Sequence, residues 1–277
     1  AIQKYVEHTG NAKQAWKDYG SKMKMILKGF EKGTDYNIGL TNEGLVTGGI
    51  VGKALTWMDA LSNGKAVTPR IGSPVEINAL WYNAMMFTLE LAEQFGDNDF
   101  VNEWRPKADA FPQAFQNAFW SAERGWLADF IKDDYKDFSV RPNMIMVVSL
   151  PYSALDGVQQ IAVLSRVQKE LLTIRGLRTL SPNHPDYEGK YQGDQATRDS
   201  QYHQGTVWPW LFGHFAEAFL KLHGTSGYRK IEWHIEQFED TLINHGVGSI
   251  SEIYDGDPPY HAKGAISQAW SVSEVLR

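Results

Sequence analysis

Two carboxylates in this sequence lie in loop-like stretches close to aromatic side chains. Asp59 follows Trp57 in "TWMDALSNGK", next to a glycine-containing turn, and Glu252 lies in "GSISEIY". Hydrolysis of a glycosidic bond needs two carboxyl groups: one delivers a proton to the leaving oxygen, and the other activates water or attacks carbon. Asp59 and Glu252 are candidates for these two roles. They are far apart in the sequence, so only a closed fold can bring them together.

A second set of residues suits the binding of a polyhydroxylated ligand. Aromatic rings match the apolar faces of a sugar ring, and Trp and Tyr add a polar edge. Charged and amide side chains hold hydroxyl groups by strong or bidentate hydrogen bonds. The candidate substrate-binding residues are Trp57, Arg70, Glu76, Trp81, Asp199, Tyr202, His203, Gln204 and Trp208.

Each of these residues also has a purely structural interpretation. Asp59 can cap a turn, as short carboxylates commonly do, and Glu252 can lie on the exposed face of an edge strand. Glu76 falls in the first turn of an expected helix, where a carboxylate interacts well with the helix dipole. Trp208 can be a core residue, because large aromatic side chains carry much of core burial. From the spacing alone, both interpretations stay open.

The composition excludes several classes of protein. The chain is 43% hydrophobic and 22% charged, with a net charge of -6 and no cysteine. A net negative charge without Lys and Arg runs argues against nucleic-acid binding. The lack of cysteine excludes disulfide frameworks, thiolate nucleophiles and Cys-based zinc sites. No stretch reaches the roughly 18 apolar residues of a membrane-spanning helix, and no signal pattern begins the chain. We therefore expect a cytoplasmic protein with no membrane partner.

Motifs for cofactors and metals are missing. The stretch "GGIVGKA" (48–54) resembles a phosphate-binding loop, but Thr47 and Ala54 stand where that loop needs glycine and Ser or Thr. The eight histidines show no pairing at metal-ligand spacing. No Gly-x-Ser-x-Gly turn marks a serine hydrolase. We expect neither a metal nor a cofactor.

Apolar spacing of three and four residues predicts a mainly helical chain. The clearest helical faces begin at Ile77, at Val207 and at Ile231, and weaker patterns cover 11–32, 107–122, 142–150, 157–172 and 262–276. Long loops are expected at 40–73, 173–205 and 246–261, and short strands at 126–130 and 248–254. Loops of that length in a compact domain are usually functional. The prediction is an all-α chain with its function in the connections.

Five stretches, taken in order along the chain, resemble a known family. They are "LTWMDA", "VTPRIGSPVEINALWYNA", "ELLTIRGLRTLSP", "GDQATRDSQYHQGTVWPW", and "ISEIYDGD" followed by "GAISQAWSVSEVLR". Together they resemble the C-terminal glucosidase domain of glycogen debranching enzymes, the amylo-α-1,6-glucosidase, over residues from about 40 to 277.

The resemblance implies an (α/α)6 toroid whose loops at one end form a pocket for a terminal glucose. It implies hydrolysis of the α-1,6-linked glucose at a trimmed glycogen branch point, with inversion, so an α-glucan is the expected partner. By position, Asp59 is the expected general acid and Glu252 the expected general base. We expect burial beside Trp57 to raise the pKa of Asp59, so that it is protonated at neutral pH.

One departure from the family leads to further expectations. The family carries an upstream Trp-Gly-Arg-Asp motif that contributes to the pocket, and this chain has no counterpart. We therefore expect residues 1–277 to form a single toroid domain that is incomplete at its N-terminal side, as the C-terminal part of a longer parent. Uncovered apolar faces would favour non-native packing of residues 1–40 or self-association. An inactive fragment or glucan-binding module, or a related toroid glucosidase such as a glucoamylase-like enzyme, stays an alternative.

Overall fold

Amphipathic segments form most of the chain, and the long helices lie where the apolar spacing predicts them. The computed structural model describes all 277 residues, and 52% of them are helical. The helices are α1 (Ile2–Thr9), α2 (Ala12–Lys32), α3 (Val75–Gln94), α4 (Asn98–Phe119), α5 (Ile145–Ser149), α6 (Gly157–Glu170), α7 (Gln195–Gln201), α8 (Trp210–His223), α9 (Tyr228–Glu236), α10 (Glu239–Asn244) and α11 (Ala269–Leu276).

Short antiparallel strands connect the helices, so the all-α prediction holds only for the dominant elements. The strands are β1 (Gly39–Leu40), β2 (Val46–Thr47), β3 (Leu61–Ser62), β4 (Lys65–Ala66), β5 (Ser73–Pro74), β6 (Trp120–Ser121), β7 (Trp126–Leu127), β8 (Phe130–Lys132), β9 (Tyr135–Asp137), β10 (Leu172–Thr173), β11 (Gly176–Arg178), β12 (Val207–Trp208), β13 (Ile253–Tyr254) and β14 (Ala262–Lys263). One five-stranded sheet has the order β10-β11-β12-β13-β14. A three-stranded sheet has the order β5-β8-β9.

Strand pairing corrects two predicted helix starts. The helix expected from Val207 begins at Trp210, because Val207 pairs with Arg178 of β11 and with Tyr254 of β13. The helix expected over 262–276 begins at Ala269, because β14 pairs with β13. The sheet thereby joins the 207–208 stretch to the segment that follows Glu252.

Two other predicted helices are present with different bounds. The helix expected at 107–122 starts at Asn98 and contains both Pro106 and Pro112. The side chain of Asp97 caps it by accepting a hydrogen bond from the backbone N–H of Phe100 at 3.3 Å. The face that begins at Ile231 is divided between α9 and α10, and neither α1 nor α7 was predicted.

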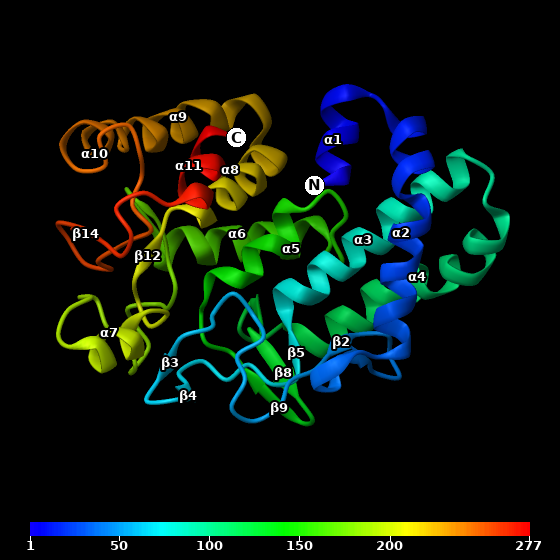
Figure 1. Cartoon of the computed structure of the whole chain (residues 1–277), viewed down its shortest axis with the longest axis horizontal. Helices are drawn as coiled ribbons and strands as arrows, with labels where there is room; N and C mark the ends of the chain where they lie inside the picture. The colour runs from blue at the N-terminus through cyan, green and yellow to red at the C-terminus, as the bar shows by residue number, and fades with distance from the viewer.

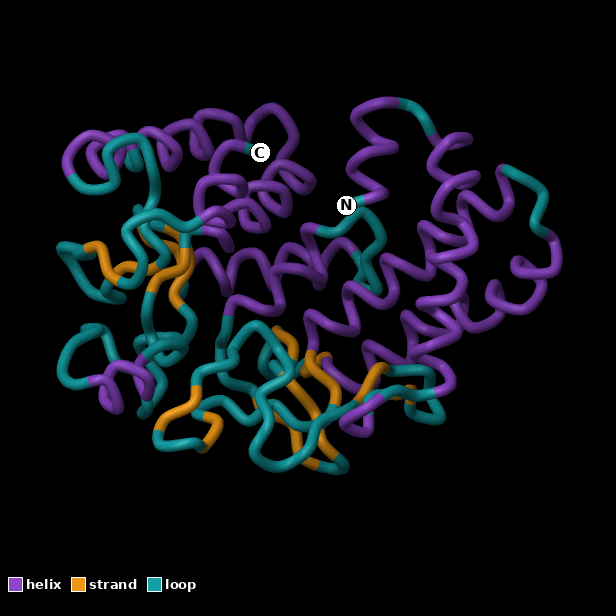
Figure 2. The backbone as a smooth tube through the Cα atoms, in the orientation of Figure 1, coloured by secondary structure: helices purple, strands orange, loops and turns teal.

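The helices form an arc that runs from α4 and α2 through α3, α5 and α6 to α8, α11 and α9 (Figure 1). One cluster of 45 buried hydrophobic residues extends along this arc from Leu27 in α2 to Val275 in α11. Most of the strands and long loops lie together along one side of the helices (Figure 2). This segregation places the loops that carry Asp59 and Glu252 on a common face.

The first helix, α1, contacts both α8 and α3 by polar side chains. Lys4 Nζ lies 2.7 Å from Glu217 Oε1 of α8, and Gln3 Oε1 accepts a 2.7 Å hydrogen bond from Asn83 of α3. Its eight residues include no buried side chain. Whether residues 1–40 pack here in a non-native way stays a prediction. No helix combines the length and the apolar character needed to cross a membrane.

Candidate active site

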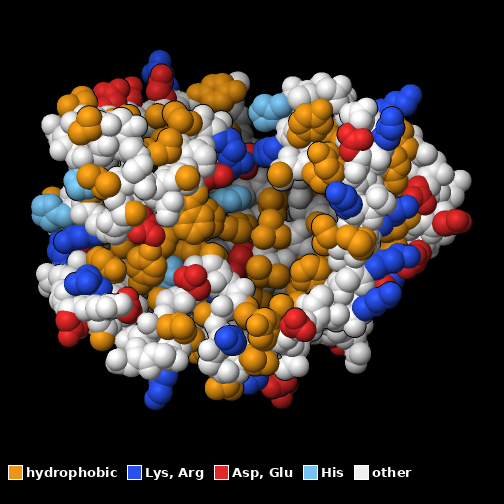
Figure 3. Space-filling model, in the orientation of Figure 1, with side chains coloured by type: hydrophobic (Ala, Val, Ile, Leu, Met, Phe, Trp, Pro, Cys, Tyr) orange, Lys and Arg blue, Asp and Glu red, His pale blue; other side chains and the backbone are white.

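Aromatic rings from two parts of the chain, Trp57 and the segment 203–210, form the floor of the candidate site. Trp57 meets His203, Trp208 and Trp210 edge to face, with ring centroids 5.1, 5.5 and 5.1 Å apart. His203 stacks on Trp208 at 5.2 Å. The space-filling view is hollowed near its centre, where hydrophobic side chains gather (Figure 3).

Trp57 is held in place by a buried polar chain. Its indole N–H donates to Asn143 Oδ1 at 2.7 Å, and Asn143 Nδ2 donates to Asp129 Oδ1 at 2.7 Å. Asp129 in turn accepts from Arg70 Nε at 2.7 Å. Arg70 also donates to Glu76 Oε1 at 2.5 Å and to Oε2 at 2.6 Å.

This arrangement corrects the expectation that Arg70 and Glu76 bind sugar hydroxyls. Both side chains are only 2% exposed, and they are paired with each other. Burial alone would lower the pKa of Arg70, but Asp129 and Glu76 outweigh it and raise that pKa. Arg70 and Glu76 are therefore fixed by each other, and Arg70 supports the position of Trp57 through Asp129 and Asn143.

Arg70→Met is expected to lower the free energy of unfolding by about 3–5 kcal/mol, because it leaves Asp129 and Glu76 buried without their cation. Urea denaturation measures this loss. Arg105→Met is the matched control, since Arg105 and its partner Glu93 are 31% and 46% exposed and such pairs contribute about 0–1 kcal/mol. Equal losses in the two variants would contradict the structural role of the Arg70 cluster.

Two predicted sugar-binding tryptophans are core residues. Trp81 lies within α3 at 6% exposure and packs against Phe30 and Trp104 at 5.7 and 6.0 Å. It belongs to the helical core, and its ring packs on Phe30 and Trp104 and not on the Trp57 cluster. Trp208 is 2% exposed and supports His203 and Trp57 from beneath. Both indoles are buried for the same reason: each points from its helix or strand into the hydrophobic core.

Asp59 lies above the aromatic floor, beside the buried imidazole of His203. Asp59 Oδ1 is 3.7 Å from His203 Nε2, and the Asp59 side chain is 68% exposed. Neither ring nitrogen of His203 has a hydrogen-bond partner. Burial lowers the pKa of His203, so the imidazole is neutral at neutral pH. The polar contact of Asp59 with the His203 ring, although longer than an ordinary hydrogen bond, is the main cause that lowers the pKa of Asp59.

The expectation that burial beside Trp57 raises the pKa of Asp59 is therefore wrong for this structure. The carboxyl group is open to solvent, and its nearest polar neighbour favours the ionised form. Unperturbed aspartate titrates near pH ~3.9, so a lowered pKa leaves Asp59 ionised at neutral pH. A role as general acid then requires that a bound ligand displace water and raise this pKa.

Titration of the Asp59 carboxyl carbon by ¹³C NMR is expected to give a pKa below the ordinary aspartate range. His203→Gln removes the neighbouring imidazole, so the pKa should rise toward about 3.9. The Asp59→Asn variant lacks this carboxyl group, so the signal that disappears from its spectrum is that of Asp59. A wild-type pKa at or above the ordinary value, with no response to His203→Gln, would contradict the influence of His203.

Glu252 is fixed at both carboxylate oxygens. The hydroxyl of Tyr202 donates to Oε1, and the backbone N–H of Ala265 donates to Oε2 at 2.9 Å. Gly264 allows this approach, since it has a φ of +66° and a Cβ there would lie 2.4 Å from Oε2. The bond to Glu252 and burial together raise the pKa of Tyr202, with burial the larger cause, so its hydroxyl remains a donor.

Tyr202 and His203 join the two carboxylates. Their rings are 4.9 Å apart, with Glu252 bonded to the first and Asp59 beside the second. Asp59 and Glu252 therefore lie on either side of one residue pair, although they come from distant parts of the chain. Trp57 and Tyr202 are each only partly buried.

The remaining candidates lie on the segment that carries this pair. Gln204 accepts a hydrogen bond from the buried Arg141 at 2.7 Å, and Arg141 also donates to the carbonyl of His203 at 2.8 Å. Asp199 is half-buried on α7, with no side-chain partner among the hydrogen bonds and ion pairs. Arg141 thus positions the His203–Gln204 backbone, while Asp199 stays a candidate ligand contact.

Sequence reasoning missed Trp270 and the polar pair of Asn143 and Asp129. Trp270 is 36% exposed and stacks on Trp210 at 5.0 Å, so it extends the aromatic floor toward α11. Trp270 ends the stretch "SQAW" near the C-terminus, but the apolar spacing around it indicates only that a helix begins there. Nothing in the sequence signals that Asn143 and Asp129 lie under Trp57.

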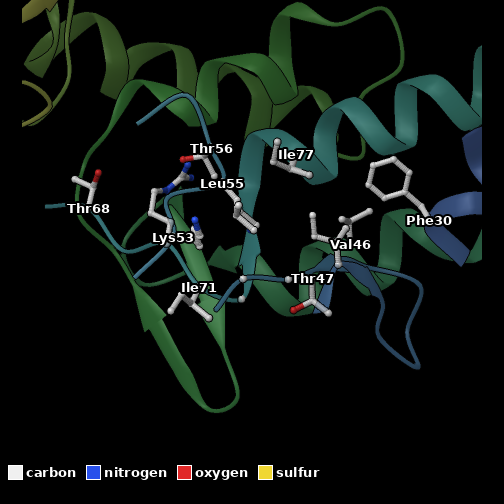
Figure 4. A pocket seen from close by; sticks show the side chains of 15 residues that line it. Phe30, Val46, Thr47, Lys53, Leu55, Thr56, Thr68, Ile71 and Ile77 are labelled. Atoms are coloured by element: carbon white, nitrogen blue, oxygen red, sulfur yellow. The ribbon is translucent and has the colours of Figure 1, made fainter. Parts of the chain in front are cut away.

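A separate pocket of 160 Å³ lies between α2, α3 and the loops at 46–56 and 68–74 (Figure 4). Apolar side chains such as Phe30, Val46 and Ile77 line it, together with Lys53 and three threonines. Neither Asp59 nor Glu252 contributes to its lining. The pocket lies next to the loop that leads to Trp57, apart from the two carboxylates.

Solved structures of several enzymes share this fold. Neutral trehalase Nth1 from Saccharomyces cerevisiae matches with a TM-score of 0.58 and 13% identity, over 78% of this chain and 39% of that one. A structure named sialidase matches with a TM-score of 0.65 and 14% identity, over 92% of this chain and 22% of that one. The fold is thus one that glycoside hydrolases adopt, and the paired carboxylates over an aromatic floor suit that class of enzyme.

The family model of amylo-alpha-1,6-glucosidase matches residues 1–277, and the chain belongs to this family of glycoside hydrolases. Glycogen debranching enzyme of Saccharomyces cerevisiae is 27% identical over 290 residues, which cover 84% of this chain and 19% of the yeast protein. The family resemblance expected from the sequence is confirmed. The chain spans about a fifth of the length of this relative.

Proposed function

We propose that this chain hydrolyses the α-1,6-linked glucose stub at glycogen branch points, with inversion at the anomeric carbon. One observation carries the proposal: in a chain of the amylo-alpha-1,6-glucosidase family, Asp59 and Glu252 flank the Tyr202–His203 pair above an aromatic floor. The substrate would be an α-glucan, and the arc of helices would be part of an (α/α)6 toroid. Residues 1–277 would form one domain of a longer protein, and a cytoplasmic location stays a prediction.

The two carboxylates would divide the reaction between them. Glu252 takes a proton from a water molecule, and that water attacks the anomeric carbon from the face opposite the leaving group. Asp59 delivers its proton to the glycosidic oxygen as the carbon–oxygen bond breaks. An inverting geometry needs about 6.5–9.5 Å between the carboxyl groups, because the water lies between the base and the sugar.

Substrate binding would prepare Asp59 for its role. A sugar seated on Trp57 covers the exposed carboxyl group and removes water from it, which disfavours the ionised form. Tyr202 and the Ala265 amide keep Glu252 in a fixed orientation meanwhile. The acid and the base thus differ in environment: Asp59 depends on the ligand, whereas Glu252 is held by the protein.

A second candidate function is an α-glucan-binding module without catalysis. The exposure of Asp59 and its lowered pKa favour this alternative, because an ionised carboxylate is no general acid. A glucoamylase-like preference for another linkage is a further alternative within the same reaction class.

Incubation of the chain with a debranching limit dextrin distinguishes these functions. The proposal predicts release of free glucose from the limit dextrin and little from maltose, which has only an α-1,4 linkage. Binding of the dextrin without any glucose release would favour the module. Faster release from maltose than from the dextrin would favour the glucoamylase-like alternative.

A further inference from the structure

An open groove of 930 Å³ lies between α9, α10 and α11, and neither Asp59 nor Glu252 lines it. Its lining is mainly apolar and includes Ile231, Phe238 and Val275. Exposed apolar side chains continue it to the surface: Tyr228 is 58% exposed, Ile235 42%, Leu242 36% and Leu276 80%. Apolar surfaces of this kind usually bind another macromolecule.

The rim of the groove carries negative charge. Glu232, Glu236 and Glu239 line it, and all three are exposed. None of them makes an ion pair, whereas most glutamates on α2, α3 and α4 do. The surface therefore suits an occupant that is both apolar and basic.

The outer face of α2 is partly apolar and carries two exposed lysines, Lys22 and Lys32, against one exposed aspartate, Asp18. Tyr19, Lys22 and Ile26 follow at spacings of three and four residues, so they share one face of the helix. Tyr19 is 41% exposed, Met25 65% and Ile26 56%. Lys22 and Lys32 are exposed and make no ion pair.

The two surfaces lie on opposite flanks of the molecule, with α9 and α10 at one end of the arc and α2 at the other (Figure 1). One molecule cannot bring them together. Lys and Arg side chains lie beside hydrophobic ones over the α2 flank in the space-filling view (Figure 3).

We infer that the acidic groove of one molecule receives the basic, apolar face of α2 from a second copy of this chain. Apolar side chains would fill the groove, and Lys22 and Lys32 would meet the unpaired glutamates at its rim. Such a contact uses different surfaces on the two copies, so it is head-to-tail and can propagate beyond a dimer.

Sedimentation velocity over a wide range of concentration tests the inference. The weight-average mass is expected to rise with concentration, and added salt should weaken association because it screens the charges. A chain that stays monomeric throughout this range would overturn the inference.

Charge reversal makes the test specific to these surfaces. Glu232→Lys with Glu236→Lys, and separately Lys22→Glu with Lys32→Glu, should each weaken association about tenfold or more, since like charges would then face each other. An equimolar mixture of the two double variants should associate again, because each reversed surface then meets its complement. Glu123→Lys and Lys169→Glu, which change exposed charges outside both surfaces, are the controls and should associate as the unchanged chain does.

Circular dichroism establishes that each variant is folded. Association that is unaffected by the double reversals, or double variants that stay monomeric when mixed, would overturn the head-to-tail contact. Recovery in the mixture alone identifies the second copy as the occupant of the groove.

Discussion

Glu252→Gln is expected to reduce glucose release from limit dextrin by about 10³-fold, because a positioned general base contributes about 10²–10⁴-fold to the rate. Glutamine keeps the shape: its carbonyl oxygen can accept from the Ala265 N–H, and its amide NH2 can donate to the Tyr202 hydroxyl, so the site should remain assembled. The expected change is therefore in kcat, with little change in dextrin binding. Initial rates and a binding isotherm on the same variant measure the two effects.

The loss should be specific to the position of Glu252. Glu123→Gln makes the same chemical change at an exposed residue with no ion pair, and it should leave the rate unchanged. If Glu252→Gln retained near wild-type rates, Glu252 would not be the base, and a surface role for this residue would regain support.

Asp59→Asn is expected to lower the rate on limit dextrin by about 10²–10⁴-fold, the range for loss of a general acid. The same variant should keep most of its activity on α-glucosyl fluoride. Fluoride departs readily without protonation, so that substrate does not need the acid. Glu252→Gln should be slow on both substrates, because each of them needs an activated water.

The contrast between the two variants assigns the roles. Equal losses of Asp59→Asn on the dextrin and on the fluoride would show that Asp59 does more than donate a proton. A glucosyl fluoride activity retained by Glu252→Gln and lost by Asp59→Asn would reverse the assignment.

The sequence predicted the long helices well because their burial follows local spacing. α2 and α3 are bounded closely by the apolar pattern. The predictions from apolar spacing fail where distant segments pair. The helix expected from Val207 begins later, because β12 pairs there with β11 and β13. Such pairing leaves no trace in a window of a few residues.

The sequence predicted the two carboxylates of the candidate site better than it predicted the residues around them. The sequence motifs identified Asp59, Glu252, Trp57 and Tyr202, which the structure brings together around His203. Residue type alone does not distinguish a charged side chain that meets a ligand from one that is paired beneath it. Arg70 illustrates this limit, because its partner Asp129 lies far away in the sequence, between β7 and β8.

The stereochemistry of the first product tests the central claim most directly. Limit dextrin is incubated with the unaltered chain, and ¹H NMR follows the anomeric proton of the glucose before mutarotation occurs. An inverting reaction by Asp59 and Glu252 predicts β-glucose as the first product. If α-glucose were released first, the enzyme would retain configuration, and the assignment of Glu252 as a base acting through water would be contradicted.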